Sequence, residues 1–109
     1  MTLRRSKFNN KKTKLDGITF DSKKEAARYH YLSMMRRAGN ITNLEVQPKI
    51  PLMVNGKKLG HYIGDFRYIE NGEVILEDVK SVATKTAVYN LKKKILASYD
   101  PPILIREIM

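Results

Sequence analysis

The spacing of apolar and polar residues along the chain predicts a hairpin, a helix, three strands, a second helix and a last strand. Residues 13–20 are typical of a tight hairpin, because the Asp16-Gly17 pair supplies the positive φ angles of a two-residue turn. A helix is predicted from residue 23 to about 38, since Ser22 and Glu25 have the spacing of a capping box. We expect its buried face to carry Ala27, Tyr31, Met34, Met35 and Ala38.

Three extended segments follow the first helix. Residues 44–54, about 59–69 and 73–80 are predicted as strands, and each junction carries an Asn-Gly pair, Asn55-Gly56 and Asn71-Gly72. Two prolines in the first of these segments remove ladder donors and favour an edge or interrupted strand. The sequence therefore predicts three antiparallel strands after the helix.

A second helix is predicted from about residue 85 to 99, and residues 103–108 form a last strand. The buried stripe of this helix is expected to consist of Val88, Leu91, Ile95 and Tyr99. The whole pattern predicts an α+β domain with a central mixed β-sheet flanked by helices. A chain of 109 residues has room for one such core, and we assign residues 13–109 to it and residues 1–12 to a basic tail.

Charge narrows the function classes. Twenty-one Lys and Arg against eleven Asp and Glu give a net charge of +10, which favours polyanionic partners. There is no cysteine, so disulfides, thiolate nucleophiles and sulfur-ligated zinc are excluded. We expect no membrane association, because no apolar stretch approaches the roughly 20 residues of a membrane helix, and the start of the chain does not resemble a secretory signal. The expected location is the cytoplasm.

Two groups of basic residues are candidates for binding nucleic-acid phosphates. One lies in the tail and the other in the second helix, where the alternative is an ordinary solvated face. The candidates are Arg4, Arg5, Lys7, Lys11, Lys12, Lys92 and Lys93. No glycine-rich phosphate loop is present, which argues against a nucleotide cofactor.

The Asn71-Gly72 turn is expected to bring candidate catalytic side chains together. In a two-residue hairpin the flanking residues pair, which sets Asp65 opposite Asp78 with Lys80 on the same face of the sheet. Opposed carboxylates repel each other, and a divalent cation such as Mg²⁺ would compensate. A neighbouring lysine could hold a phosphate or stabilise developing negative charge. The alternatives are solvated charges on an exposed face, or a one-residue slip that would bring Glu77 to this face in place of Asp78.

Several short motifs resemble those of a known superfamily. Gly64-Asp65, then Asp78-Val79-Lys80 after a hairpin, resembles the bipartite motif of the PD-(D/E)XK nucleases, with glycine in place of the motif's proline. The predicted order of elements is similar to the restriction-endonuclease-like core of that superfamily. Residues 20–26, 44–49 and 77–80 further resemble short, mostly phage-borne proteins similar in layout to phage Holliday-junction resolvases.

This resemblance implies a role for each matching residue. Asp65, Asp78 and the Val79 carbonyl would be metal ligands, and Lys80 would be the catalytic lysine. Glu25 would complete the site from the first helix as catalytic acid and metal ligand, although a purely structural capping role is an alternative.

The function expected from these observations is Mg²⁺-dependent hydrolysis of DNA phosphodiesters, with Mn²⁺ as a substitute. The resemblance favours branched DNA or Holliday junctions as substrate, and a homodimer because a junction has two strands to cut. The alternatives are a nicking or end-cutting nuclease of phage replication, packaging or transposition, and a non-catalytic basic DNA-binding protein on the same fold. A phage-encoded protein of this kind would act in the host cytoplasm.

Overall fold

The structure is a computed structural model that describes residues 12–79 and 86–108. Its elements confirm the predicted α+β class and alternate along the chain much as the sequence indicates. They are β1 (Thr13–Leu15), β2 (Ile18–Phe20), α2 (Lys23–Arg37), β3 (Thr42–Val46), β4 (Lys49–Val54), β5 (Lys57–Ile63), β6 (Phe66–Glu70), β7 (Glu73–Val79), α3 (Ala87–Ala97) and β8 (Leu104–Ile108).

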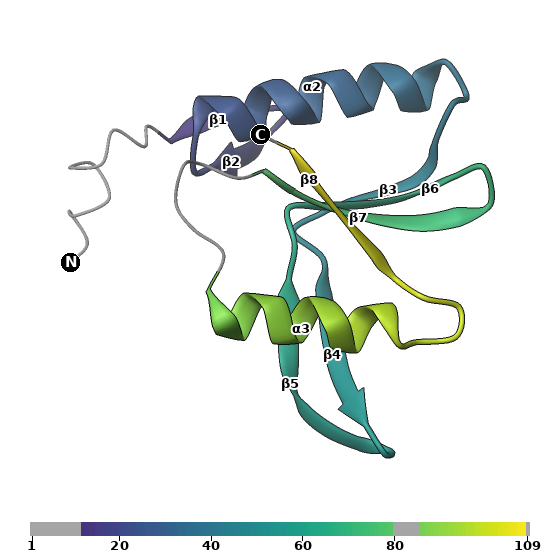
Figure 1. The fold of residues 1–109 in the computed structure, drawn as a ribbon. Helices are drawn as coiled ribbons and strands as arrows, with labels where there is room; N and C mark the ends of the chain where they lie inside the picture. The colour runs from purple at the N-terminus through teal and green to yellow at the C-terminus, as the bar shows by residue number, and fades with distance from the viewer. Residues whose placement is uncertain (1–11, 80–85, 109) are drawn as a thin grey trace.

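A four-stranded sheet in the order β3-β6-β7-β8 forms the centre of the fold. The pairs β3–β6 and β6–β7 are antiparallel, and β8 returns parallel to β7 after α3, so the predicted mixed sheet is confirmed. Figure 1 shows α2 on one side of this sheet and α3 on the other. The parallel return of β8 follows from the α3 crossover, which turns the chain back along β7.

The predicted two-residue turns are confirmed by their backbone angles. Asp16, Asn55 and Asn71 each have a φ between 51° and 52°, and the glycine after each also has a positive φ. The turn at Asn71 sets the β6–β7 register as predicted, with Glu70 opposite Glu73 and Phe66 opposite Glu77. In this hairpin the pairing of residues, and so the face to which each side chain points, is therefore the one predicted from the sequence.

The prediction of three strands between the helices was wrong in number, because two of them break. The segment 44–54 divides at Gln47 and Pro48, where Gln47 adopts a φ of 54° and the proline has no N–H to continue a ladder. The segment 59–69 divides at the same level: Gln47 N donates to Asp65 O at 2.9 Å, and Gly64 N donates to Pro48 O at 3.1 Å. The strands β4 and β5 consequently form a separate hairpin that leaves the sheet, as Figure 1 shows.

The predicted buried face of α2 was also wrong. Ala27, Tyr31, Met34 and Ala38 are exposed and Met35 is half-buried, whereas Ala26, Tyr29, Leu32 and Ser33 are buried. Aromatic packing selects this face, since the ring of Tyr29 lies 5.2 Å from Phe20 and 6.4 Å from Phe66. Tyr31 instead lies at the surface beneath the guanidinium of Arg28, 4.7 Å from its ring centroid.

The stripe predicted for α3 needs a similar correction. Val88 and Leu91 are 61% and 59% exposed, while Tyr89 and Leu96 are buried and Ile95 is partly buried. The helix faces the β4–β5 hairpin as well as the sheet, so its contact surface is rotated from the apolar stripe. Within the described residues no helix is long and apolar enough to cross a membrane.

Two hydrophobic clusters fill the two sides of the sheet. The cluster beneath α2 contains the side chains of Phe20, Leu32, Phe66 and Tyr68 among others. The cluster beneath α3 joins Leu76 of the sheet to the hairpin and helix through Ile50, Leu52, Tyr62, Tyr89 and Leu96. The second cluster attaches the β4–β5 hairpin and α3 to each other.

Gly64 is expected to be required by packing. A Cβ at this position would lie 2.5 Å from Leu76 Cδ1, and Leu76 is fully buried. Gly64→Ala should lower the free energy of unfolding by about 1–3 kcal/mol through overpacking, measured by urea denaturation. The penalty should shrink in a Leu76→Val background, which removes the clashing carbon. An equal penalty in both backgrounds would show that this contact does not explain the glycine.

Candidate active site

Asp65 and Asp78 lie beside each other where β6 begins and β7 ends. Asp65 N donates to Glu77 O at 3.0 Å, and Asp65 Oδ2 accepts from Val79 N at 2.6 Å. These two bonds flank Asp78, which is 7% exposed. The Asp65 carboxylate is thereby held against the end of β7, the strand that carries Asp78.

Glu25 adds a third carboxylate from the first turn of α2. Its pKa is raised from the usual 4.5 to about 7, mainly by burial and then by the negative charges of Asp65, Asp21 and Asp78, against a lowering by a hydrogen bond from the Asp21 backbone. Glu25 is therefore close enough to both sheet acids to interact with their charge. Three elements far apart in sequence bring these carboxylates into one region.

The capping role of Glu25 is only partly as predicted. Ser22 is the N-cap, and its Oγ accepts from Glu25 N at 3.1 Å. The Glu25 side chain accepts from the backbone of Asp21 and so reaches one residue beyond the cap. This contact orients the carboxylate at the helix N-terminus and leaves it near the two sheet acids.

Glu77, the alternative to Asp78, belongs to the opposite face of the sheet. Its fully buried carboxylate accepts two bonds from Arg28, from Nε at 2.8 Å and from Nη2 at 2.6 Å, and a short bond from the Tyr68 hydroxyl. Arg106 Nη1 in turn donates to the Tyr68 oxygen at 3.0 Å. Glu77 is thus compensated within the α2 side of the sheet and does not face Asp65.

Sequence reasoning missed a fourth carboxylate near the site. Glu107 of β8 lies next to Asp78 in the parallel register, accepts from the Tyr89 hydroxyl at 2.6 Å, and has Lys93 Nζ at 3.6 Å. Burial, this hydrogen bond and the charges of Glu107 and Asp78 raise the pKa of Tyr89. Only the pairing of β8 with β7 reveals this neighbour, since Glu107 lies 28 positions beyond the end of β7 in sequence.

The other predicted site residues are placed in part. Val79 ends β7, with its N–H bonded to Asp65, and Lys92 of α3 reaches the carbonyl of His61 at 3.5 Å. Lys12 pairs with Asp21 at 3.4 Å. The remaining predictions fall outside the described residues, namely those for Lys80, Arg4, Arg5, Lys7 and Lys11.

The donor chemistry of this region fits a hard divalent cation. Carboxylate oxygens suit Mg²⁺, which is bound in proteins through one or two carboxylates with water in its remaining positions. Asp65 and Asp78 provide such a pair. In residues 12–79 and 86–108, no three acidic or histidine side chains are close enough to bind one ion together. The carboxylates of Glu25, Asp65 and Asp78 therefore do not all meet at one ion in this arrangement.

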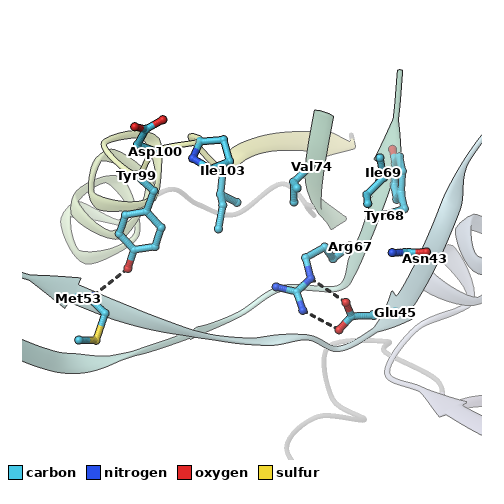
Figure 2. Close-up of a pocket in the computed structure, with 11 residues that line it drawn as sticks. Asn43, Glu45, Met53, Arg67, Tyr68, Ile69, Val74, Tyr99, Asp100 and Ile103 are labelled. Carbon is cyan, nitrogen blue, oxygen red and sulfur yellow. Dashed lines mark hydrogen bonds and ion pairs between the residues drawn. The ribbon is translucent and has the colours of Figure 1, made fainter. Parts of the chain in front are cut away.

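A pocket of about 610 Å³ lies elsewhere, between β6, β7 and the end of α3. Figure 2 shows Arg67 directed at Glu45, with bonds of 3.0 and 2.7 Å, and the Tyr99 hydroxyl directed at the backbone of Met53. The charged pair in the pocket is mutually neutralised, and none of Glu25, Asp65 and Asp78 lines it. The pocket is thus separate from these three acids, which we call the acidic site.

The profile of one protein family matches almost the whole chain. Residues 5–103 match the family described as "Protein of unknown function (DUF1064)", and the chain belongs to this family. No curated protein and no solved structure matches the chain.

Glu77 and Asp78 are neighbours whose substitution should lower stability to very different extents. Glu77→Gln should lower the free energy of unfolding by about 2–3 kcal/mol, because it removes the charge that satisfies buried donors of Arg28 and Tyr68. Asp78→Asn should cost less than about 1 kcal/mol, since it relieves repulsion with Asp65. Urea denaturation of both variants at pH 7 tests this. The reverse order of stability would contradict the assignment of the two faces.

Glu25 should make stability depend on pH. The folded pKa of about 7 exceeds the usual value of 4.5, so the folded state holds the proton of Glu25 more tightly than the unfolded state does. The resulting stabilisation of the fold is fully present below about pH 4.5 and is lost as the pH rises through 7. Glu25→Gln should therefore gain stability relative to wild type between pH 5 and pH 8, by the order of 1 kcal/mol after solvent screening. Denaturation in EDTA measures this gain. Asp100→Asn, at an exposed position, is the control, and an equal gain there would refute the electrostatic origin.

Proposed function

We propose that the protein is a Mg²⁺-dependent endodeoxyribonuclease of the PD-(D/E)XK type. The observation that carries this proposal is the gathering of Glu25, Asp65 and Asp78 in one region, where burial first, and then the charges of Asp65, Asp21 and Asp78, raise the pKa of Glu25. Perturbed carboxylates gathered in this way are typical of functional sites, and their negative charge favours a bound cation.

Each residue has a distinct part in the proposed reaction. Asp65 and Asp78 hold the ion, and the Val79 carbonyl is a further ligand. The ion, when bound, polarises the phosphodiester and lowers the pKa of a coordinated water. Glu25, with a pKa of about 7, is suited to accept a proton from an attacking water near neutral pH. Lys80, which follows Val79 directly in sequence, balances the charge of the transition state.

The arrangement of α2, the mixed sheet and α3 supports the proposed restriction-endonuclease-like core. In that reading β3, β6 and β7 are the three antiparallel core strands, and β8 is the strand that follows the second helix. The β4–β5 hairpin is an insertion between two core strands. The net charge of +10 supports DNA as the substrate, and the resemblance to resolvases supports branched DNA cut by a homodimer.

One observation favours a second candidate function. Because no three acids among the described residues meet at metal-binding distance, a non-catalytic DNA-binding protein on the same fold also fits. Such a protein would keep the basic charge and use the acids only to shape the surface. Cleavage, and not binding, distinguishes the two functions.

The decisive experiment measures cleavage of a labelled four-way junction and of a linear duplex with the same arms. Wild type should cut the junction in Mg²⁺ or Mn²⁺ and not in EDTA. Asp65→Asn and Asp78→Asn should slow cutting by at least about 100-fold, because each removes charge that stabilises the reacting centre. Asp100→Asn is the matched control, with the same charge change at an exposed position away from the site.

Three outcomes would count against the proposal. Binding of DNA without cutting in either metal ion would support the non-catalytic function. Equal activity of Asp78→Asn and Asp100→Asn would remove Asp78 from the site. Faster cutting of the linear duplex would support a nicking or end-cutting nuclease over a junction-selective one.

A further inference from the structure

Acidic residues are missing from two long stretches of the chain. Between Glu45 and Asp65, and again between Asp78 and Asp100, the sequence contains lysines and one histidine but neither Asp nor Glu. All eleven acids lie outside these stretches. The described residues of the two stretches form β4, β5 and α3, and their basic side chains are Lys49, Lys57, Lys58, His61, Lys92, Lys93 and Lys94.

These two acid-free stretches are neighbours in space. The buried side of the β4–β5 hairpin packs on α3 through one hydrophobic cluster, in which Ile50, Leu52 and Tyr62 meet Tyr89 and Leu96. Figure 1 shows the hairpin projecting from the sheet with α3 lying across it and the hairpin tip extending beyond the helix. We call β4, β5 and α3 together the basic lobe. Its positive charge is therefore concentrated at one end of the molecule.

The hairpin presents an exposed basic face away from the cluster. Cross-strand pairing sets Lys49 opposite Ile63, and Met53 opposite Lys58, with all four side chains exposed. Residues from Met53 to Leu59 are all exposed, and Leu59 at the bulge near the tip is 65% exposed. The side opposite α3 is thus an uncovered two-stranded ribbon.

Lysines from the hairpin and from α3 lie near the same residue, His61. Lys92 Nζ lies 3.5 Å from His61 O and so joins α3 to β5. Partial loss of hydration lowers the pKa of His61, and the charges of Lys49, Lys58 and Lys92 lower it further. Positive charges from three elements therefore converge here, and a bound polyanion would relieve their repulsion.

We propose that the basic lobe is the duplex-DNA-binding surface of the protein, with the β4–β5 ribbon in the major groove and α3 lysines on the flanking phosphates. This inference rests on the proposed nuclease function and extends it to the mode of substrate binding. The B-DNA major groove admits a two-stranded β-ribbon, whereas the A-form RNA groove is too deep and narrow. Charge complementarity alone would not distinguish duplex DNA from duplex RNA.

The base of the ribbon connects this surface to the acidic site. Gly64 N and Pro48 O bond across the hairpin base at 3.1 Å, and Asp65 follows directly in sequence. On the α3 side, Lys93 reaches Glu107 next to Asp78. DNA lying along the basic lobe would therefore lead a phosphate to the carboxylates, which need the neighbouring positive charge to approach a phosphodiester.

Binding of a labelled duplex DNA in EDTA, over a range of salt concentrations, tests the proposal without requiring catalysis. The lobe variant combines Lys49→Ala, Lys58→Ala and Lys92→Ala. It should bind at least about 10-fold more weakly at low salt, and its salt slope should fall by up to about 3, since each lost phosphate contact contributes about 0.9. The matched control removes three exposed charges of α2, through Lys23→Ala, Arg36→Ala and Arg37→Ala, and should retain most of the affinity.

Further measurements distinguish the effects of charge, of folding and of the type of nucleic acid. A lobe variant with arginine at the same three positions should bind like wild type, and thermal melting should show all variants folded. Duplex RNA of the same sequence should bind more weakly than duplex DNA. Equal weakening of the lobe and control variants, equal binding of RNA, or no binding of DNA by wild type would each overturn the proposal.

The result is distinguishable from failure of the nuclease function. If wild type never cuts DNA while the lobe variant loses binding, the basic lobe is a DNA-binding surface and the catalytic proposal fails. If Asp78→Asn abolishes cutting while the lobe variant binds like wild type, the catalytic proposal stands and this inference fails.

Discussion

A single buried carboxylate organises the domain. Glu77 is completely buried in the central sheet, where an unpaired charge would cost several kcal/mol. Its partners come from separate elements: Arg28 from α2, Tyr68 from β6, and Arg106 from β8 through the Tyr68 hydroxyl. The ion pair forms when α2 lies on the correct face, and Arg106 extends the chain of bonds when β8 is added beside β7. The helix position and strand order are therefore coupled to one side chain.

The same side chain decides where the candidate site can lie. Because alternate residues of a strand face opposite ways, fixing Glu77 toward α2 directs Asp78 to the other side. The two neighbouring acids then have different electrostatic surroundings. Glu77 is bonded by Arg28 and Tyr68 on the α2 side, whereas Asp78 lies beside Glu107 of β8 and next to the Val79 N–H that binds Asp65.

The break in two strands links this acidic region to the basic end of the molecule. Bonds between Gln47 and Asp65 and between Gly64 and Pro48 close the base of the β4–β5 hairpin and release it from the sheet. Gly64 allows close approach to Leu76 at that point. Acidic and basic groups thereby share a boundary at the base of the hairpin, which is the arrangement that the proposed binding of DNA and of a cation requires.

The sequence by itself determined the α+β class, the turns and the β6–β7 register, because Asn-Gly and Asp-Gly turns and strand alternation are local properties. It therefore predicted that Asp65 opposes Asp78. The buried faces of both helices and the departure of the β4–β5 hairpin were decided by tertiary structure. Tyr29 and Tyr89 are buried by contacts with distant partners, and neither Glu107 beside Asp78 nor the Arg28–Glu77 pair has a local signal. Such contacts arise from packing between elements, and no short-range pattern encodes them.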